Sequence, residues 1–175
     1  TAKALADETR REALAHSLPY WEAWAQILLG SLETDPRKGA ADVEAAISRY
    51  CVTGSRQVLP YAYILLSGCH LRAGDVDGAR IAATEAARAR RPGGVRLFDA
   101  EIERQHALVA RQNGLLSGTD EECRRMLRRG YETALAQGAE LFARRAAGSL
   151  VELEAGNAAA LAAMKLAVRN ERRFH

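Results

Sequence analysis

The sequence predicts an all-α protein of about nine helices that pair into successive hairpins. Its hydrophobic residues are mostly Ala and Leu, which favour helices, whereas the residues that favour strands are sparse and scattered. Helix breakers recur at regular intervals along the chain. Between them, apolar residues recur at the three- and four-residue spacing of an amphipathic helix.

The breakers divide the chain into segments of helical length, and each segment predicts one helix. The first breaker is Ser17-Leu18-Pro19 and the last is Gly156-Asn157. The predicted helices span about 2–17, 19–34, 37–53, 58–73, 76–91, 95–113, 120–137, 139–155 and 158–170.

Several of these helices begin with residues that cap a helix N-terminus. Asp35 precedes Pro36, which places a capping carboxylate before a proline at the first helical position. Thr119 and Glu122 have the spacing of a capping box, in which each side chain accepts a hydrogen bond from the backbone N–H of the other. The remaining expected caps are Asp75 and Asn157.

A small residue recurs in the first helix of each predicted hairpin, where it lets two helix backbones approach closely. These residues are Gly30, Ser67, Ala107 and Ser149, at separations of 37, 40 and 42 residues. The matching positions in the second helices are Ala46, Ala86, Gly130 and Val168. This register predicts four stacked units, within a single domain of residues 1–175, at about 19–54, 58–92, 95–137 and 139–170, behind a leading helix at 1–17.

The register resembles that of tetratricopeptide (TPR) repeats, which implies a right-handed superhelix of TPR-like hairpins, although these units are longer than the usual 34 residues or so. Four stretches carry a closer resemblance: Pro19-Tyr20-Trp21-Glu22-Ala23-Trp24, then Tyr50-Cys51-Val52-Thr53-Gly54 with Pro60-Tyr61, then Phe98-Asp99-Ala100-Glu101-Ile102-Glu103-Arg104, and 122–139. They are similar to the TPR-like C-terminal region of large bacterial signal-transduction ATPases, including LuxR-type regulators and adenylate cyclase homologues. The resemblance implies a cytoplasmic regulator whose ATPase and output domains lie outside this chain, which also lacks a start Met.

The sequence predicts no enzyme, no metal site and no cofactor. It contains no phosphate-binding loop, no dinucleotide fingerprint and no nucleophile elbow. Cys69 and His70 are adjacent, so on a helix they point about 100° apart and cannot form a nucleophile–base pair. The cysteines, Cys51, Cys69 and Cys123, are odd in number and widely spaced, which argues against disulfides and indicates a reducing cytoplasm.

The net charge of +3 is too small to indicate a nucleic acid or an anionic membrane as partner. Dense arginine runs at 88–96 and 124–129 could bind phosphates in principle. We interpret them instead as solvated helix faces, because Glu121 and Glu122 can pair with Arg124 or Arg125, and 88–91 end a helix, where cations are favoured. No apolar run approaches the length of a membrane span.

In stacked hairpins the first helix of each pair lines a concave groove, and its outward positions are candidates for partner binding. In this register they are Trp24, Ile27 and Ser31, then Tyr61, Ile64, Gly68, Leu71 and Arg72, then Glu101, Arg104, Leu108 and Arg111. We expect Trp21 and Tyr63 to be core residues, and leave Trp24 and Tyr61 open between core and groove. Glu101 and Arg104 have the spacing of an ion pair within one helix.

The leading expectation is a non-catalytic protein-interaction scaffold from a bacterial signalling or transcription regulator, bound to a protein partner or to other domains of the same chain. One alternative is a small-molecule (inducer) sensing domain, with Trp24, Tyr61, Glu101 and Arg104 in a mixed aromatic and polar pocket. Another is a homodimer formed through an exposed apolar end of the array.

Overall fold

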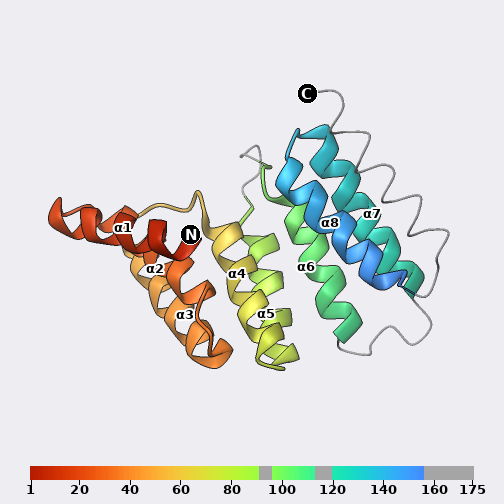
Figure 1. The fold of residues 1–175 in the computed structure, drawn as a ribbon, viewed down its shortest axis with the longest axis horizontal. Helices are drawn as coiled ribbons and strands as arrows, with labels where there is room; N and C mark the ends of the chain where they lie inside the picture. Colours follow the sequence, from red (N-terminus) through yellow and green to blue (C-terminus); the bar gives the residue numbers. More distant parts are fainter. Residues whose placement is uncertain (91–95, 113–119, 156–175) are drawn as a thin grey trace. The chain divides into compact units, whose positions relative to one another are not determined.

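A computed structural model describes residues 1–90, 96–112 and 120–155, and over these residues the chain forms eight α-helices and no strand (Figure 1). The helices are α1 (Ala2–Ala15), α2 (Pro19–Ser31), α3 (Pro36–Val52), α4 (Leu59–Arg72), α5 (Val76–Arg88), α6 (Asp99–Gln112), α7 (Asp120–Ala136) and α8 (Glu140–Leu153). The all-α prediction is therefore confirmed. The predicted ninth helix, 158–170, lies outside the described residues.

The predicted start of α6 at residue 95 is wrong, because the helix begins at Asp99. Arg96 and Asp99 form a turn before it, in which the Asp99 amide donates to the Arg96 carbonyl at 3.1 Å. The Arg96 Nε also donates to Asp99 Oδ2 at 2.6 Å. The helix α6 begins at the end of this turn.

Capping residues set the starts of α3 and α5 as predicted. Asp35 accepts hydrogen bonds from the amides of Arg37 and Lys38, at 2.9 and 3.4 Å. Asp75 accepts from the amide of Gly78 at 2.9 Å. Carboxylates there satisfy amides that have no partner inside the helix. The expected caps Thr119 and Asn157 lie outside the described residues.

The chain divides into two compact units, Thr1–Gly94 with α1 to α5 and Val95–His175 with α6 to α8. The prediction of a single domain therefore stays a prediction. Each unit has its own core. In unit 1 the core includes Ile27, Val43, Tyr50 and Leu66. In unit 2 it includes Ala107, Cys123, Leu127 and Leu150.

Helices pair in chain order within each unit. In unit 1, α2 packs mainly on α3 and α4 mainly on α5, while α4 also contacts both α2 and α3. In unit 2, α6 packs on α7, and α8 contacts both α7 and α6. In each unit, therefore, one hairpin and the first helix of the next form a mutually packed triplet: α2, α3 and α4, or α6, α7 and α8.

The recurring small residues lie where the two helices of a hairpin meet. A Cβ built on Gly30 would stand 2.9 Å from Val43 Cγ2 and 3.0 Å from the Val43 amide nitrogen. In the next hairpin the Ser67 hydroxyl donates to the Ala79 carbonyl at 2.8 Å. In unit 2 the Cys123 thiol donates to the Ala107 carbonyl at 3.5 Å. These close approaches lie where α2 packs on α3, α4 on α5 and α6 on α7.

Replacement of Ser67 by alanine is expected to destabilise the protein by about 1 kcal/mol, because the substitution leaves the Ala79 carbonyl without its buried partner. Ser48, whose hydroxyl makes an exposed bond to the Glu44 carbonyl, is the matched control and should change little on the same substitution. Urea unfolding followed by circular dichroism measures both. Equal losses at the two positions would show that the buried hydroxyl contributes nothing specific.

Candidate functional site

We call the surface formed by the first helices of successive hairpins the first-helix face. In unit 1 it is formed by α2 and α4, which lie in contact with each other. At one end of it, the rings of Trp24 and Tyr61 approach with centroids 6.2 Å apart and planes tilted by 52°. Both side chains are partly buried. Trp24 and Tyr61 are therefore neither fully buried core residues nor fully exposed groove residues. Each ring packs against the other and still exposes part of its surface to solvent.

Arg72 marks the other end of this face. Its Nη2 donates to the Ser31 carbonyl at the end of α2, at 2.9 Å, and lies 3.4 Å from the Cys69 sulfur. The last carbonyls of a helix carry partial negative charge, so a guanidinium there is favourable. Burial raises the pKa of the Cys69 thiol, which keeps it protonated and unreactive.

Between the aromatic pair and Arg72 the face contains Gly68. A Cβ built there would meet only Arg72 Nη1, at 3.8 Å, which is an ordinary contact distance. Gly68 therefore leaves open space in the middle of the face, in contrast to Gly30, which is enclosed by α3.

Ile27 and Ile64, predicted as groove residues of this face, are buried at 0% and 3% exposure, so both assignments are wrong. Ile27 belongs to the core because Gly30, one turn later, draws α2 against α3 and encloses the side chain. The assignment of Trp21 to the core is also wrong, since its side chain is 49% exposed. Tyr63 packs partly buried against the core of unit 1.

The first-helix face of unit 2 is ionic instead of aromatic. Glu101, on α6, is only 1% exposed, and Arg104 binds it with two hydrogen bonds, from Nη2 at 2.7 Å and Nε at 3.0 Å. From α8, Arg145 adds a third bond to Glu101 at 3.1 Å. Arg104 also reaches the Ser149 hydroxyl at 3.4 Å. The predicted pair of Glu101 and Arg104 is thus confirmed, and sequence reasoning missed Arg145.

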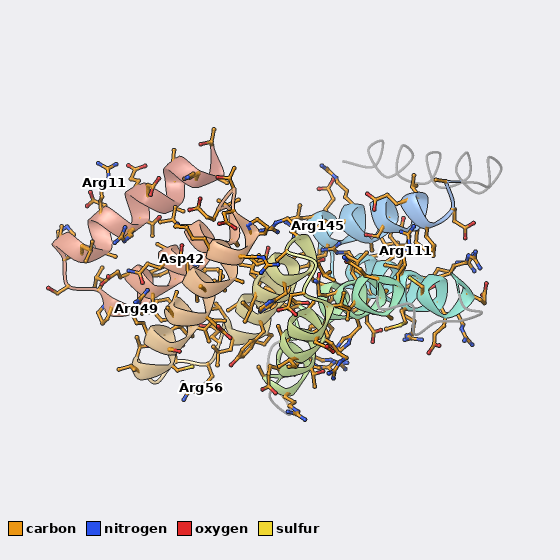
Figure 2. The ribbon with its side chains drawn as sticks, turned by 90° about the horizontal axis from the view of Figure 1, so that it is seen from below. Arg11, Asp42, Arg49, Arg56, Arg111 and Arg145 are labelled. Carbon is orange, nitrogen blue, oxygen red and sulfur yellow. The ribbon has the colours of Figure 1, made fainter. Side chains whose placement is uncertain are left out.

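This network holds the guanidinium groups of Arg104 and Arg145 around the Glu101 carboxylate. The Arg104 side chain is 17% exposed and that of Arg145 is 39% exposed, so both reach the surface. Figure 2 shows Arg145 projecting from α8 and Arg111 projecting from the end of α6. Among the predicted groove residues of this unit, Arg111 is exposed and Leu108 is partly buried.

Trp24 and Tyr61 belong to unit 1, whereas Glu101 and Arg104 belong to unit 2. The mixed pocket expected from these four residues is therefore not a feature of either unit.

A different hollow, of about 470 Å³, lies between α3 and the turn that joins α4 to α5. His70 and Asp75 line it, with Nδ1 and Oδ2 2.8 Å apart. Hydrogen bonding from the Gly78 amide and the neighbouring His70 both lower the pKa of Asp75. Arg37 and Glu44 complete its polar lining. Sequence spacing gave no signal for this hollow, because its residues come from α3, from the end of α4 and from the turn that follows α4.

Several arginines of the two arginine-rich runs make ion pairs. Arg124 contacts both Glu121 and Glu154, and Arg88 lies 2.7 Å from Glu85. These contacts agree with the interpretation as solvated, charge-paired helix surfaces. The described part of the chain contains no group of three or more His, Cys, Asp or Glu side chains placed to hold a metal ion.

None of the described helices has the length and apolar character needed to cross a membrane. No protein-family model, no curated protein and no solved structure matches this chain.

Proposed function

We propose that this protein is a non-catalytic scaffold that binds a protein segment along its first-helix faces, as TPR-like superhelices do. The observation that carries the proposal is the α2–α4 face, where a partly exposed Trp24–Tyr61 pair and Arg72 bracket the open space at Gly68. Aromatic rings and arginine are the side chains that contribute most to binding energy at protein interfaces. In unit 1 both rings are already positioned by contact, which lowers the entropy lost on binding.

The chemistry of the face indicates the kind of segment that fits. Trp24 and Tyr61 favour an aliphatic or aromatic side chain, and Arg72, eleven residues after Tyr61 in the same helix, favours a carboxylate. We infer an acidic segment with apolar anchors, supplied by a partner protein or by another domain of the same regulator. The resemblance to bacterial signal-transduction regulators supports this setting.

Site-specific photocrosslinking in the full-length protein tests the proposal. A photoreactive residue at Trp24 or Tyr61 is expected to form one discrete adduct, with a partner protein or with another segment of the same chain. The same group at Ile81, which is 57% exposed on α5, is the control and should form none. Absence of an adduct at both aromatic positions, or equal labelling at Ile81, would contradict the proposal.

Gly68→Trp is expected to abolish the adduct at Tyr61, because the new side chain fills the open middle of the face. Gly68→Ala should leave the adduct unchanged and stabilise the helix by about 0.5–1 kcal/mol, since alanine is the better helix former. Thermal unfolding confirms that both variants fold. A Gly68→Trp variant that folds and still crosslinks would place the partner elsewhere.

The second candidate function is recognition of a small molecule, as in an inducer-sensing domain. The hollow of about 470 Å³ beside His70 and Asp75 favours it, because its volume lies in the range of small-ligand sites. A metabolite that raises the melting temperature by several degrees, and that loses this effect in Arg37→Ala, would support sensing. Arg88→Ala, an exposed arginine outside the hollow, is the control.

A further inference from the structure

The hydroxyl group of Tyr50 lies in the core of unit 1, near the end of α3. The Tyr50 residue is 0% exposed. Its hydroxyl lies 2.8 Å from the Ser55 hydroxyl and accepts a hydrogen bond from the Val58 amide at 3.4 Å. A phenylalanine would fill nearly the same space and would need no polar partners, so packing of the core does not explain why a hydroxyl group is buried here.

The residues that follow Tyr50 turn back toward its hydroxyl group. The Thr53 hydroxyl donates to the Tyr50 carbonyl at 2.7 Å, and the Ser55 amide donates to the Thr53 hydroxyl oxygen at 3.4 Å. Between Thr53 and Ser55, Gly54 adopts a φ of 78°, which favours glycine. We call residues 50–58 the α3–α4 junction. It is a turn that the Tyr50 side chain closes.

Tyr50 also contacts the beginning of α2. Its ring lies against that of Tyr20, with the two centroids 5.2 Å apart and the planes tilted by 51°. Burial, together with the hydrogen bond and charge interaction with Tyr50, raises the pKa of Tyr20. One side chain of α3 therefore contacts the first turn of α2 and also Val58, the residue that precedes α4.

Both contacts lie about one helical turn before an aromatic residue of the α2–α4 face. Tyr20 is four residues before Trp24 in α2, and Val58 is three residues before Tyr61 in α4. Residues at these spacings are neighbours on a helix surface, so a shift at the first residue also moves the second. The separation of 6.2 Å between the Trp24 and Tyr61 rings therefore depends on how Tyr50 holds the two helix starts.

We propose that Tyr50 is a positioning residue for the α2–α4 face, and that the α3–α4 junction sets through it the strength with which this face binds its partner segment. The inference rests on the scaffold function proposed above and adds the control of its binding surface. The Tyr50 hydroxyl fixes the start of α4 relative to α2, which holds Trp24 and Tyr61 as a preformed pair. Preformed rings lose less conformational entropy on binding.

Two measurements on the free chain test the placement of the rings without any partner. Trp21→Phe leaves Trp24 as the single tryptophan of the chain. In this background, Tyr50→Phe is expected to increase the quenching of Trp24 fluorescence by acrylamide. It should also speed hydrogen exchange at the Val58 amide about fivefold, the factor that corresponds to one hydrogen bond of average strength.

Ser67→Ala is the control for a general loss of stability. It also removes a buried hydroxyl group, but the Ser67 hydroxyl bonds the Ala79 carbonyl and so joins α4 to α5. Ser67→Ala should leave the quenching of Trp24 and the exchange of the Val58 amide unchanged under native conditions.

Photocrosslinking from position 61 in the full-length protein tests the effect on binding. Tyr50→Phe is expected to lower the yield of the adduct about fivefold, whereas Ser67→Ala should leave it unchanged. Ser55→Ala should lower the yield in the same direction. The double variant Tyr50→Phe/Ser55→Ala should lose less than the two single variants together, because both substitutions remove the same hydrogen bond.

Three results would overturn the proposal. The first is an equal change of Trp24 quenching in Tyr50→Phe and Ser67→Ala, since the hydroxyl group would then act only through stability. The second is a Tyr50→Phe variant with altered quenching and an unaltered yield of adduct. The third is a protein with Tyr50 intact that forms no adduct. That result would remove the scaffold function as well, and it differs from the first two because it appears without any substitution at Tyr50.

Discussion

Gly30→Ala is expected to destabilise unit 1 by about 1–3 kcal/mol, the range measured for overpacking in a closed interface. The added Cβ would stand 2.9 Å from Val43 Cγ2 and 3.0 Å from the Val43 nitrogen. The nitrogen belongs to the backbone of α3 and cannot rotate away, so the two helices must separate. Alanine is the better helix former by about 1 kcal/mol, which offsets only part of the loss.

Gly148→Ala is the matched control, because no described atom lies within 4 Å of a Cβ built there. This substitution should stabilise α8 by about 0.5–1 kcal/mol. Urea unfolding of both variants gives the comparison. The double variant Gly30→Ala/Val43→Ala should lose less stability than the two single variants lose together. Val43→Ala removes one of the two groups that clash with the added Cβ. Additive losses, or a stabilised Gly30→Ala, would show that the α2–α3 contact is looser than described.

Glu101→Gln is expected to destabilise unit 2 by about 2–3 kcal/mol. The neutral amide cannot hold both Arg104 and Arg145, and its NH₂ group turns a donor toward guanidinium donors. This loss of stability lies at the low end of the range for a broken buried ion pair, because both arginines are partly exposed and can be hydrated in the variant.

Glu121→Gln is the control for this prediction. Glu121 also pairs with an arginine, Arg124, but its side chain is 60% exposed. Glu121→Gln should therefore lower the free energy of unfolding by no more than about 0.5 kcal/mol. Thermal and urea unfolding measure both variants. A loss at Glu101 no greater than that at Glu121 would mean that the buried network does not stabilise the α6–α8 contact.

The sequence was informative wherever local chemistry decides the structure. The breakers and caps predicted the helices, since residues such as Asp35 and Asp75 act through amides two or three positions away. The recurring small residues predicted where hairpins close. The pairing of Glu101 with Arg104 followed from their spacing on one helix.

The sequence was less informative about which face of a helix is buried. Ile27 and Ile64 share a register with Trp24 and Tyr61, and only the distance between neighbouring helices decides that the isoleucines are enclosed. Trp21 lies half exposed beside Leu5 and Leu18, although its apolar ring favours burial. Arg145 was missed because it reaches Glu101 from 44 residues away in the chain.

The contacts between successive first helices differ in chemistry between the two units. An aromatic contact joins α2 to α4, whereas ion pairs to the Glu101 carboxylate join α6 to α8. Hairpins that look alike along the chain are therefore not interchangeable. A folding intermediate that stacked α8 on α2 would separate Arg145 from Glu101, and one that stacked α4 on α6 would leave Glu101 without its second guanidinium. Such mismatches work against out-of-order assembly, a hazard that chains of similar repeats face during folding.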